Sequence, residues 1–270
     1  MPNHVTNQIM VQNDDASHTK LLELAAFLKP EDGNLGDIDF NKLLPMPKEL
    51  DIEAGSRGED GLKLYSQFIK ESTMLSIANM EASKSEDEAN RLVSELMDKY
   101  ARIADENPKT WELGVKYYEN LQKYGARHWY DWRNKHWKTK WNAYDCIPWE
   151  KGSDRLQFNT AWNSVVKLVS MLSENFPETE ITYRWADEEL GYNVGELVIK
   201  DGFITDERFP IAGSKEAYEL SAEIIGISLE EMRFAFSEKE GIYVYSEDQE
   251  WCEEPTSKRG KEKKEIERGR

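Results

Sequence analysis

This sequence of 270 residues has only two cysteines and no long apolar run, and we expect no secretory leader. The two cysteines, Cys146 and Cys252, lie far apart outside any CxxC pair, which argues against a disulfide framework or a zinc site. The first residues show no basic stretch followed by an apolar one, and no run approaches the roughly 18 apolar residues of a membrane span. We therefore expect a cytoplasmic protein that does not contact membranes.

The sequence also lacks the common catalytic signatures. No P-loop, GxGxxG, GxSxG, HExxH or EF-hand loop is present. Among the four histidines, His128 and His136 lie eight residues apart, which only approximates the spacing that places two metal ligands on one helix face. We predict a protein without enzymatic activity, cofactor or bound metal.

Negative charge is what the sequence has in excess. The formal net charge is −17, with 52 Asp and Glu against 35 Lys and Arg. Residues 257–270 are the exception, because they carry seven Lys or Arg against three Glu. An acidic surface keeps a protein soluble and also attracts partners whose own grooves are basic. With 11% aromatic residues, including nine Trp, the chain is expected to fold.

Two blocks of alternating residues predict a sheet. Residues 5–11, 38–44, 140–145, 155–160 and 180–185 read as strands, and residues 195–200 with 203–205 read as a hairpin around Asp201-Gly202. Helical spacing follows the first strand and again follows residue 160. This order predicts an α+β fold, a ferredoxin-like sandwich in which two helices cover an antiparallel sheet.

A long helical stretch interrupts that pattern. Ser85-Glu86-Asp87-Glu88 forms a capping box, and an apolar stripe continues from it to Ile103. Residues 57–136 are therefore predicted to be a helical insertion, whether packed on the sheet or projecting as an arm. The other predicted units are a ferredoxin-like core of residues 1–50 and 137–212, a C-terminal α/β appendage of residues 213–256 with an edge strand at 242–245, and a flexible basic tail of residues 257–270.

Tryptophans and basic residues alternate between residues 127 and 149. Such a pattern suits single-stranded nucleic acid, because rings can stack on bases while cations contact phosphates. The same Trp side chains could instead fill the junction between insertion and sheet, as expected in an acidic protein. The nucleic-acid hypothesis rests on Arg127, Trp129, Trp132, Arg133, Lys135 and Lys138.

Acidic runs offer a second kind of candidate site. Asp187, Glu188 and Glu189 follow a predicted strand, where carboxylates either bind Mg²⁺ or form an ordinary charged turn. A metal-dependent enzyme built on Asp187, Glu188 and a distant His is the weakest of the three hypotheses. As an acidic surface for a basic partner, the candidate residues are Asp187, Glu188, Glu189, Glu247, Asp248, Glu250, Glu253 and Glu254.

Several segments together resemble the YubB ferredoxin-like family, also called Api-like phage proteins. The segments are MPNHVTN at 1–7, residues 40–50 with PMPKEL, TKWNAYD at 139–145, FNTAW at 158–162, and LSENFP at 172–177 leading into 183–191. The resemblance covers roughly residues 1–50 and 137–200. Relatives tend to have Gly where this chain has Lys138, and a Pro-containing turn where it has Asn163-Ser164. The resemblance implies a phage, prophage or plasmid accessory protein and supplies no catalytic residues.

We therefore expect an acidic accessory protein of a phage or mobile element that binds a host protein, a basic nucleic-acid-acting defence complex being the partner that fits. The alternative function is single-stranded nucleic-acid binding by residues 127–149.

Overall fold

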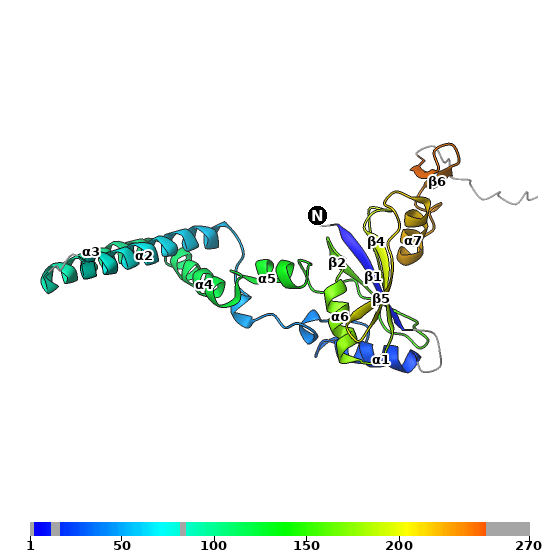
Figure 1. The fold of residues 1–270 in the computed structure, drawn as a ribbon, viewed down its shortest axis with the longest axis horizontal. Helices are drawn as coiled ribbons and strands as arrows, with labels where there is room; N and C mark the ends of the chain where they lie inside the picture. The colour runs from blue at the N-terminus through cyan, green and yellow to red at the C-terminus, as the bar shows by residue number, and fades with distance from the viewer. Residues whose placement is uncertain (1–2, 12–16, 82–84, 247–270) are drawn as a thin grey trace, which may run out of the picture.

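The structure, a computed structural model, describes residues 3–11, 17–81 and 85–246. A five-stranded sheet with helices on both faces forms the core, and a bundle of three helices extends away from it (Figure 1). The strands are β1 (His4–Val11), β2 (Leu156–Ala161), β3 (Ile181–Asp187), β4 (Val194–Lys200) and β5 (Phe203–Arg208). The core helices are α1 (Ser17–Leu28), α6 (Val166–Asn175) and α7 (Lys215–Ile225).

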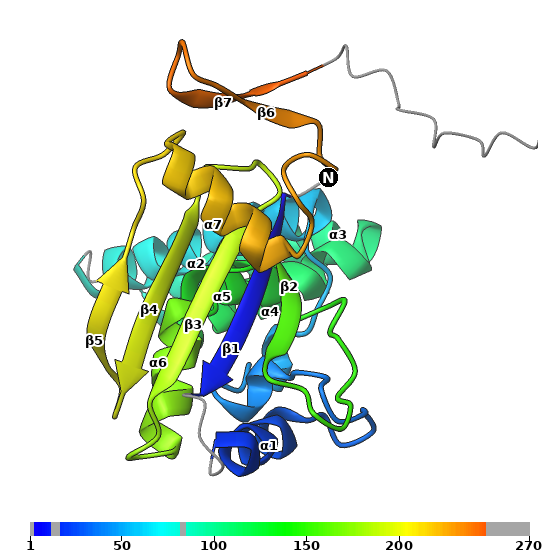
Figure 2. The same cartoon turned by 90° about the vertical axis from the view of Figure 1, so that its right-hand side faces the viewer.

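The strands lie in the order β2-β1-β3-β4-β5, and every neighbouring pair is antiparallel. Alternation decides which residues face which layer, because successive side chains of a strand point to opposite faces. Val5 and Ile9 of β1 join the cluster that α1 and α6 cover, whereas Gln8 reaches the carbonyl of Ile224 on α7. Figure 2 shows α7 lying across the opposite face of the sheet from α6. The predicted α+β fold with an antiparallel sheet is confirmed.

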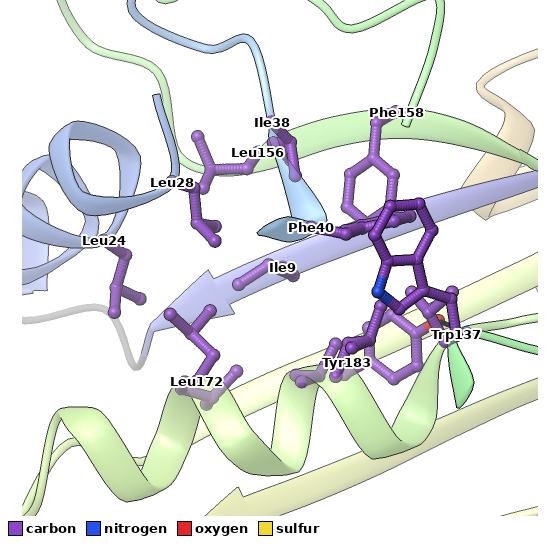
Figure 3. Packing of buried hydrophobic residues seen from close by; sticks show 14 of the residues in the cluster. Ile9, Leu24, Leu28, Ile38, Phe40, Trp137, Leu156, Phe158, Leu172 and Tyr183 are labelled. Carbon is purple, nitrogen blue, oxygen red and sulfur yellow. Dashed lines mark hydrogen bonds between the residues drawn. The ribbon is translucent and has the colours of Figure 1, made fainter. Parts of the chain in front are cut away.

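Aliphatic side chains such as Leu24, Leu28 and Leu172 fill the core beneath α1 and α6, and aromatic rings gather at one end of it (Figure 3). Phe40 contacts the rings of Trp137 and Phe158 edge to face, at centroid distances of 5.7 and 6.0 Å. The indole N–H of Trp137 donates to the carbonyl of Leu44 at 2.9 Å, so this fully buried polar atom is satisfied. The segment before the helical insertion and the segment after it are thus held together by one packed cluster.

A buried polar group joins three strands at the same place. The Asn7 side chain is fully buried and donates to the Thr160 hydroxyl at 2.9 Å. It also accepts a 2.6 Å hydrogen bond from the Tyr183 hydroxyl, which in turn accepts from the Val165 amide just before α6. Burial raises the pKa of Tyr183, so the phenol stays protonated and keeps its donor. This network fixes β1, β2, β3 and the start of α6 in register.

Two predicted strands are absent, and the prediction of strands at 38–44 and 140–145 was wrong. Phe40–Lys42 form a short 3-10 helix, and residues 140–145 form turns with one isolated bridge between Tyr144 and Asn159. The reason is that side chains satisfy the backbone there. The Asn142 side-chain oxygen accepts from the amides of Phe40 and Ala143, which removes the need for a strand partner.

The helical insertion projects as an arm. Its helices are α2 (Ser56–Glu81), α3 (Glu86–Glu106) and α4 (Pro108–Tyr124), while α5 (Trp129–His136) lies between the arm and the sheet (Figure 1). Ser85 caps α3 by accepting from the Glu88 amide, as the capping box predicts. At 1.5 Å per residue, the 26 residues of α2 span about 39 Å. No helix in these described ranges combines the length and apolar character needed to cross a bilayer.

Gly61 of α2 and Gly114 of α4 allow these two helices to pack closely. A Cβ atom on Gly114 of α4 would lie 2.2 Å from the carbonyl carbon of Gly61 in α2. A Cβ on Gly58 would similarly meet the ring of Tyr117, whose hydroxyl donates to the Glu53 carbonyl. The absence of side chains therefore lets α2 and α4 touch backbone to backbone near the base of the arm.

The segment after residue 212 divides into two parts. α7 covers the sheet, with Ala217, Leu220 and Ile224 buried against Ala186 and Val194. β6 (Phe234–Ser237) and β7 (Ile242–Tyr245) form a separate two-stranded sheet, so residues 242–245 are not the edge strand that the sequence predicted. The second layer of the core thus comes from residues that the sequence analysis assigned to an appendage.

Gly114→Ala is expected to lower the free energy of unfolding by about 1–3 kcal/mol, because the new methyl group overpacks against backbone that cannot give way. An unhindered helical Gly→Ala change would instead stabilise by about 0.5–1 kcal/mol. Urea denaturation measures the difference. Gln122→Ala, on an exposed position of the same helix, serves as control and should change stability by less than about 0.5 kcal/mol. A stabilised Gly114→Ala variant would contradict the close approach.

Candidate binding pocket at the base of the helical arm

A pocket of about 600 Å³ lies where the arm meets the core. The beginning of α2, the loop before α5, the first turn of α5 and the end of β2 all contribute to its walls. Its lining residues are Ala54, Gly55, Ser56, Glu59, Arg127, His128, Trp129, Tyr130, Asp131, Lys140 and Trp162.

Arg127 organises the floor of this pocket. Its guanidinium donates to both carboxylate oxygens of Asp131, at 2.5 and 3.0 Å, and to Glu59 of α2 at 2.5 Å. Burial alone would raise the pKa of Asp131, but the hydrogen bonds from Arg127 and the nearby positive charges hold that pKa below its usual value. The bidentate geometry fixes the guanidinium plane, so α2, the loop and α5 share one charged junction.

His128 is a helix cap in this structure. It is buried, and its Nδ1 accepts from the Asp131 amide at 3.4 Å, at the N-terminus of α5. Its ring meets that of Tyr117 edge to face with centroids 5.0 Å apart. Burial lowers the pKa of His128, so the ring stays neutral and keeps its acceptor nitrogen near neutral pH.

Aromatic rings form the side walls. Tyr130 and Trp162 meet edge to face at 6.3 Å, and Trp129 contacts Tyr130 at 5.7 Å. Trp162 has a φ angle of +72°, a left-handed conformation that is unfavourable for a bulky side chain. A 2.9 Å hydrogen bond from its amide to the Asn3 carbonyl holds that conformation. The strained backbone turns the chain sharply at the end of β2 and places this indole in the pocket wall.

Lys140 is the unpaired cation of the pocket. Its ammonium lies 4.7 Å from the ring of Trp141 and 5.7 Å from the ring of Trp162. Within the described part of the chain, no carboxylate or hydrogen-bond acceptor pairs with it. The side chain is therefore positioned by two aromatic faces while its three N–H donors stay available.

The predicted Trp and basic residues separate into three environments. Arg127 and Trp129 line the pocket, whereas Trp132 is 5% exposed and stacks on His136. Arg133 lies against the rings of Trp129 and Trp137, at 5.2 and 5.1 Å. Lys135 and Lys138 are exposed. α5 thus uses part of the predicted nucleic-acid surface for its own packing.

Several pocket residues were missed in the sequence, among them Glu59, Tyr130, Asp131 and Trp162. Glu59 lies 68 positions from its partner Arg127, and no spacing rule links them. Tyr130 follows Trp129 in α5, but the sequence pattern drew attention only to the tryptophans and basic residues. Trp162 belongs to the recognised FNTAW segment, and that is the signal which could have identified it.

The predicted acidic site also divides. Asp187 is 5% exposed and accepts hydrogen bonds from the Glu189 amide and the Asn193 side chain, so it stabilises the turn after β3. Glu188 and Glu189 are exposed. No group of three His, Cys, Asp or Glu side chains suited to a metal occurs in the residues that the structure describes. Outside the described residues lie Glu247, Asp248, Glu250, Glu253 and Glu254.

Charge is segregated along the fold. Residues 123–167, around the pocket, hold nine Lys or Arg against four Asp or Glu, a net charge of +5. Residues 178–246, from just before β3 to the end of the described chain, hold 16 Asp or Glu against six Lys or Arg, a net charge of −10. The acidic excess and the basic patch thus belong to different parts of the molecule.

Residues 136–228 match the family described as "Ferredoxin-like domain in Api92-like protein". The core is a ferredoxin-like domain. The match begins at the end of α5, includes Lys140 and Trp162, and ends just beyond α7, so α7 lies within this ferredoxin-like domain. It supports the Api-like part of the predicted resemblance.

The chain is also similar to a solved structure of a protein api92 from Yersinia pseudotuberculosis, of the family DUF1281. The two are 13% identical with a TM-score of 0.34, over 79% of this chain and 99% of that one. The search of curated proteins finds no match.

Stability near the pocket is expected to fall as the pH is lowered below 6.5. The folded pKa of His128 lies below its ordinary value, so the unfolded chain binds the proton more readily and stability rises with pH across that window. His128→Asn keeps a capping side chain and removes this titration, so urea denaturation at pH 7.5, 6.5 and 5.5 should show a weaker pH dependence.

Burial also lowers the pKa of His136, so this residue contributes a pH dependence of the same direction. His136→Gln is the matched control that isolates it. An unchanged slope in His128→Asn would contradict the buried, neutral cap.

Proposed function

We propose that this chain is a non-enzymatic binding protein that engages a partner protein through the acidic part of its core. The net charge of −10 on residues 178–246 is the observation that carries the proposal. A segment with this excess of carboxylates attracts basic partners and repels bare nucleic acid. The partner class that it fits is a protein whose groove normally holds DNA or RNA, since carboxylates can take the place of phosphates there.

The outer edge of the sheet is the surface that we assign to this contact. We define the edge surface as residues 203–211, which comprise β5 and the three residues after it. All six residues of β5 are exposed, and Asp206 and Glu207 form no ion pair within the described structure. Phe203 is 76% exposed and Ile211 is 81% exposed. Exposed apolar side chains of this kind can form the buried centre of a protein contact, with the acidic side chains at its polar rim.

We further propose that the protein belongs to a phage or another mobile element and blocks a host defence complex that acts on nucleic acid. The resemblance to Api-like proteins supports the origin, and the acidic surface supports the mode of inhibition. Binding at the edge surface would then compete with the nucleic acid of the partner.

A double charge reversal, Asp206→Lys with Glu207→Lys, should abolish capture of the partner from host lysate. Bound partner should be released from the wild-type chain by excess double-stranded DNA. Glu86→Lys with Asp87→Lys, on the exposed start of α3, reverses the same number of charges far from the edge surface and should leave capture intact.

Equal loss in both double variants would show that net charge alone attracts the partner. Retention of the partner in the Asp206/Glu207 variant, or a partner that DNA does not displace, would contradict the proposed surface or mode of inhibition respectively.

A further inference from the structure

The pocket at the base of the arm offers hydrogen-bond donors without acceptors. In the described structure, neither the Lys140 ammonium nor the indole N–H groups of Trp129 and Trp162 donate to any acceptor, whereas the indoles of Trp137 and Trp185 do. The carboxylates Glu59 and Asp131 are both occupied by Arg127. A ligand that complements these groups therefore brings acceptors or negative charge, together with a flat apolar face for the rings.

Basic side chains continue from the pocket across the surface. The backbone carbonyl of Lys138 accepts from the Asn163 side chain at 3.0 Å, which places Lys138 beside Trp162. Lys135, Lys138 and Lys167 all lie near enough to His136 to lower its pKa, in addition to the effect of its burial. These three lysines are exposed and form no ion pair within the described residues. Lys135 also donates to the Gly125 carbonyl at 3.5 Å, whereas the ammonium groups of Lys138 and Lys167 have no partner in the described residues. Several exposed cations beside the pocket suit a chain of phosphates better than a single anion.

The strained backbone at Trp162 is the third observation. A non-glycine residue in the left-handed region costs about 1–2 kcal/mol, and such strain often marks a functional position. Here the ring gains little from burial in return, because Trp162 is only partly buried and forms a pocket wall. The conformation presents a flat aromatic surface at the rim, next to the cation of Lys140.

We propose that this pocket binds a nucleotide of a single-stranded nucleic acid, with the base against Trp162 and Tyr130 and its phosphate on Lys140. Neighbouring phosphates follow the lysine row formed by Lys135, Lys138 and Lys167. Stacking on aromatic rings beside cations is the usual mode for single strands. The distant acids do not prevent it, since the Debye length is about 8 Å at physiological ionic strength. The pocket and the edge surface share no residues, so a test of nucleotide binding is independent of the proposed protein contact.

The test uses the full chain and fluorescently labelled 12-residue oligo(dT) and oligo(U), with anisotropy measured at 50 and 200 mM salt. Binding should weaken as salt increases. Lys140→Gln and Trp162→Gly should each weaken it about tenfold. Trp162→Gly is chosen because glycine adopts the +72° φ angle without strain, so the ring is removed while the backbone is relieved.

Lys109→Gln, an exposed lysine on α4, and Tyr245→Leu, an exposed ring on β7, are the matched controls and should leave binding unchanged. Circular dichroism and thermal melts verify the fold of each variant, and Lys140→Gln retains every ring if Trp162→Gly proves unstable. No binding at 50 mM salt would overturn the proposal. An equal loss in Lys109→Gln and Lys140→Gln would also overturn it, because attraction would then be non-specific.

Equally tight binding of a duplex of the same length would overturn the proposal as well, because a paired base cannot enter the pocket.

Discussion

One guanidinium group joins the base of the arm to the helix that leads back to the sheet. Arg127 binds Asp131 on α5 and Glu59 on α2, and it lies in the loop between α4 and α5. Removing one member of a half-buried charge cluster leaves its partners unpaired, which costs far more than the intact cluster contributes. The same three side chains form the floor of the pocket, so one charged cluster belongs both to the base of the arm and to the pocket.

Much of the core could be predicted because burial imposes a period. β1, β2 and β3 were identified from alternating residues, and Ser85 was identified as a cap from the glutamate three residues later. The segments at 38–44 and 140–145 alternate too, yet Asn142 replaces the strand partner with a side-chain oxygen. Alternation of apolar and polar residues indicates which side chains are buried, but it does not indicate which groups form hydrogen bonds with the backbone. That explains both errors.

The pocket was only half visible in the sequence. Arg127 and Trp129 stand in a basic and aromatic run that was recognised, but α5 turns Trp132 inward against His136 and leaves Trp129 at the pocket. Trp162 depends on a single left-handed φ angle, and no composition or period indicates such an angle at a tryptophan. Glu59 is brought in by the contact of α2 with α4 at Gly61 and Gly114, which is a tertiary event.

The contact between Gly61 and Gly114 is a point about which α2 could rotate relative to α4. Twenty residues of α2 lie beyond Gly61, a lever of about 30 Å, so a rotation of about 5° at the contact displaces the far end by about 3 Å. Residues 72–80 near that end contain no charged side chain, and Met74, Ile77 and Met80 are exposed there. A small rotation at the base would therefore displace these exposed apolar side chains further than it displaces the residues of the pocket.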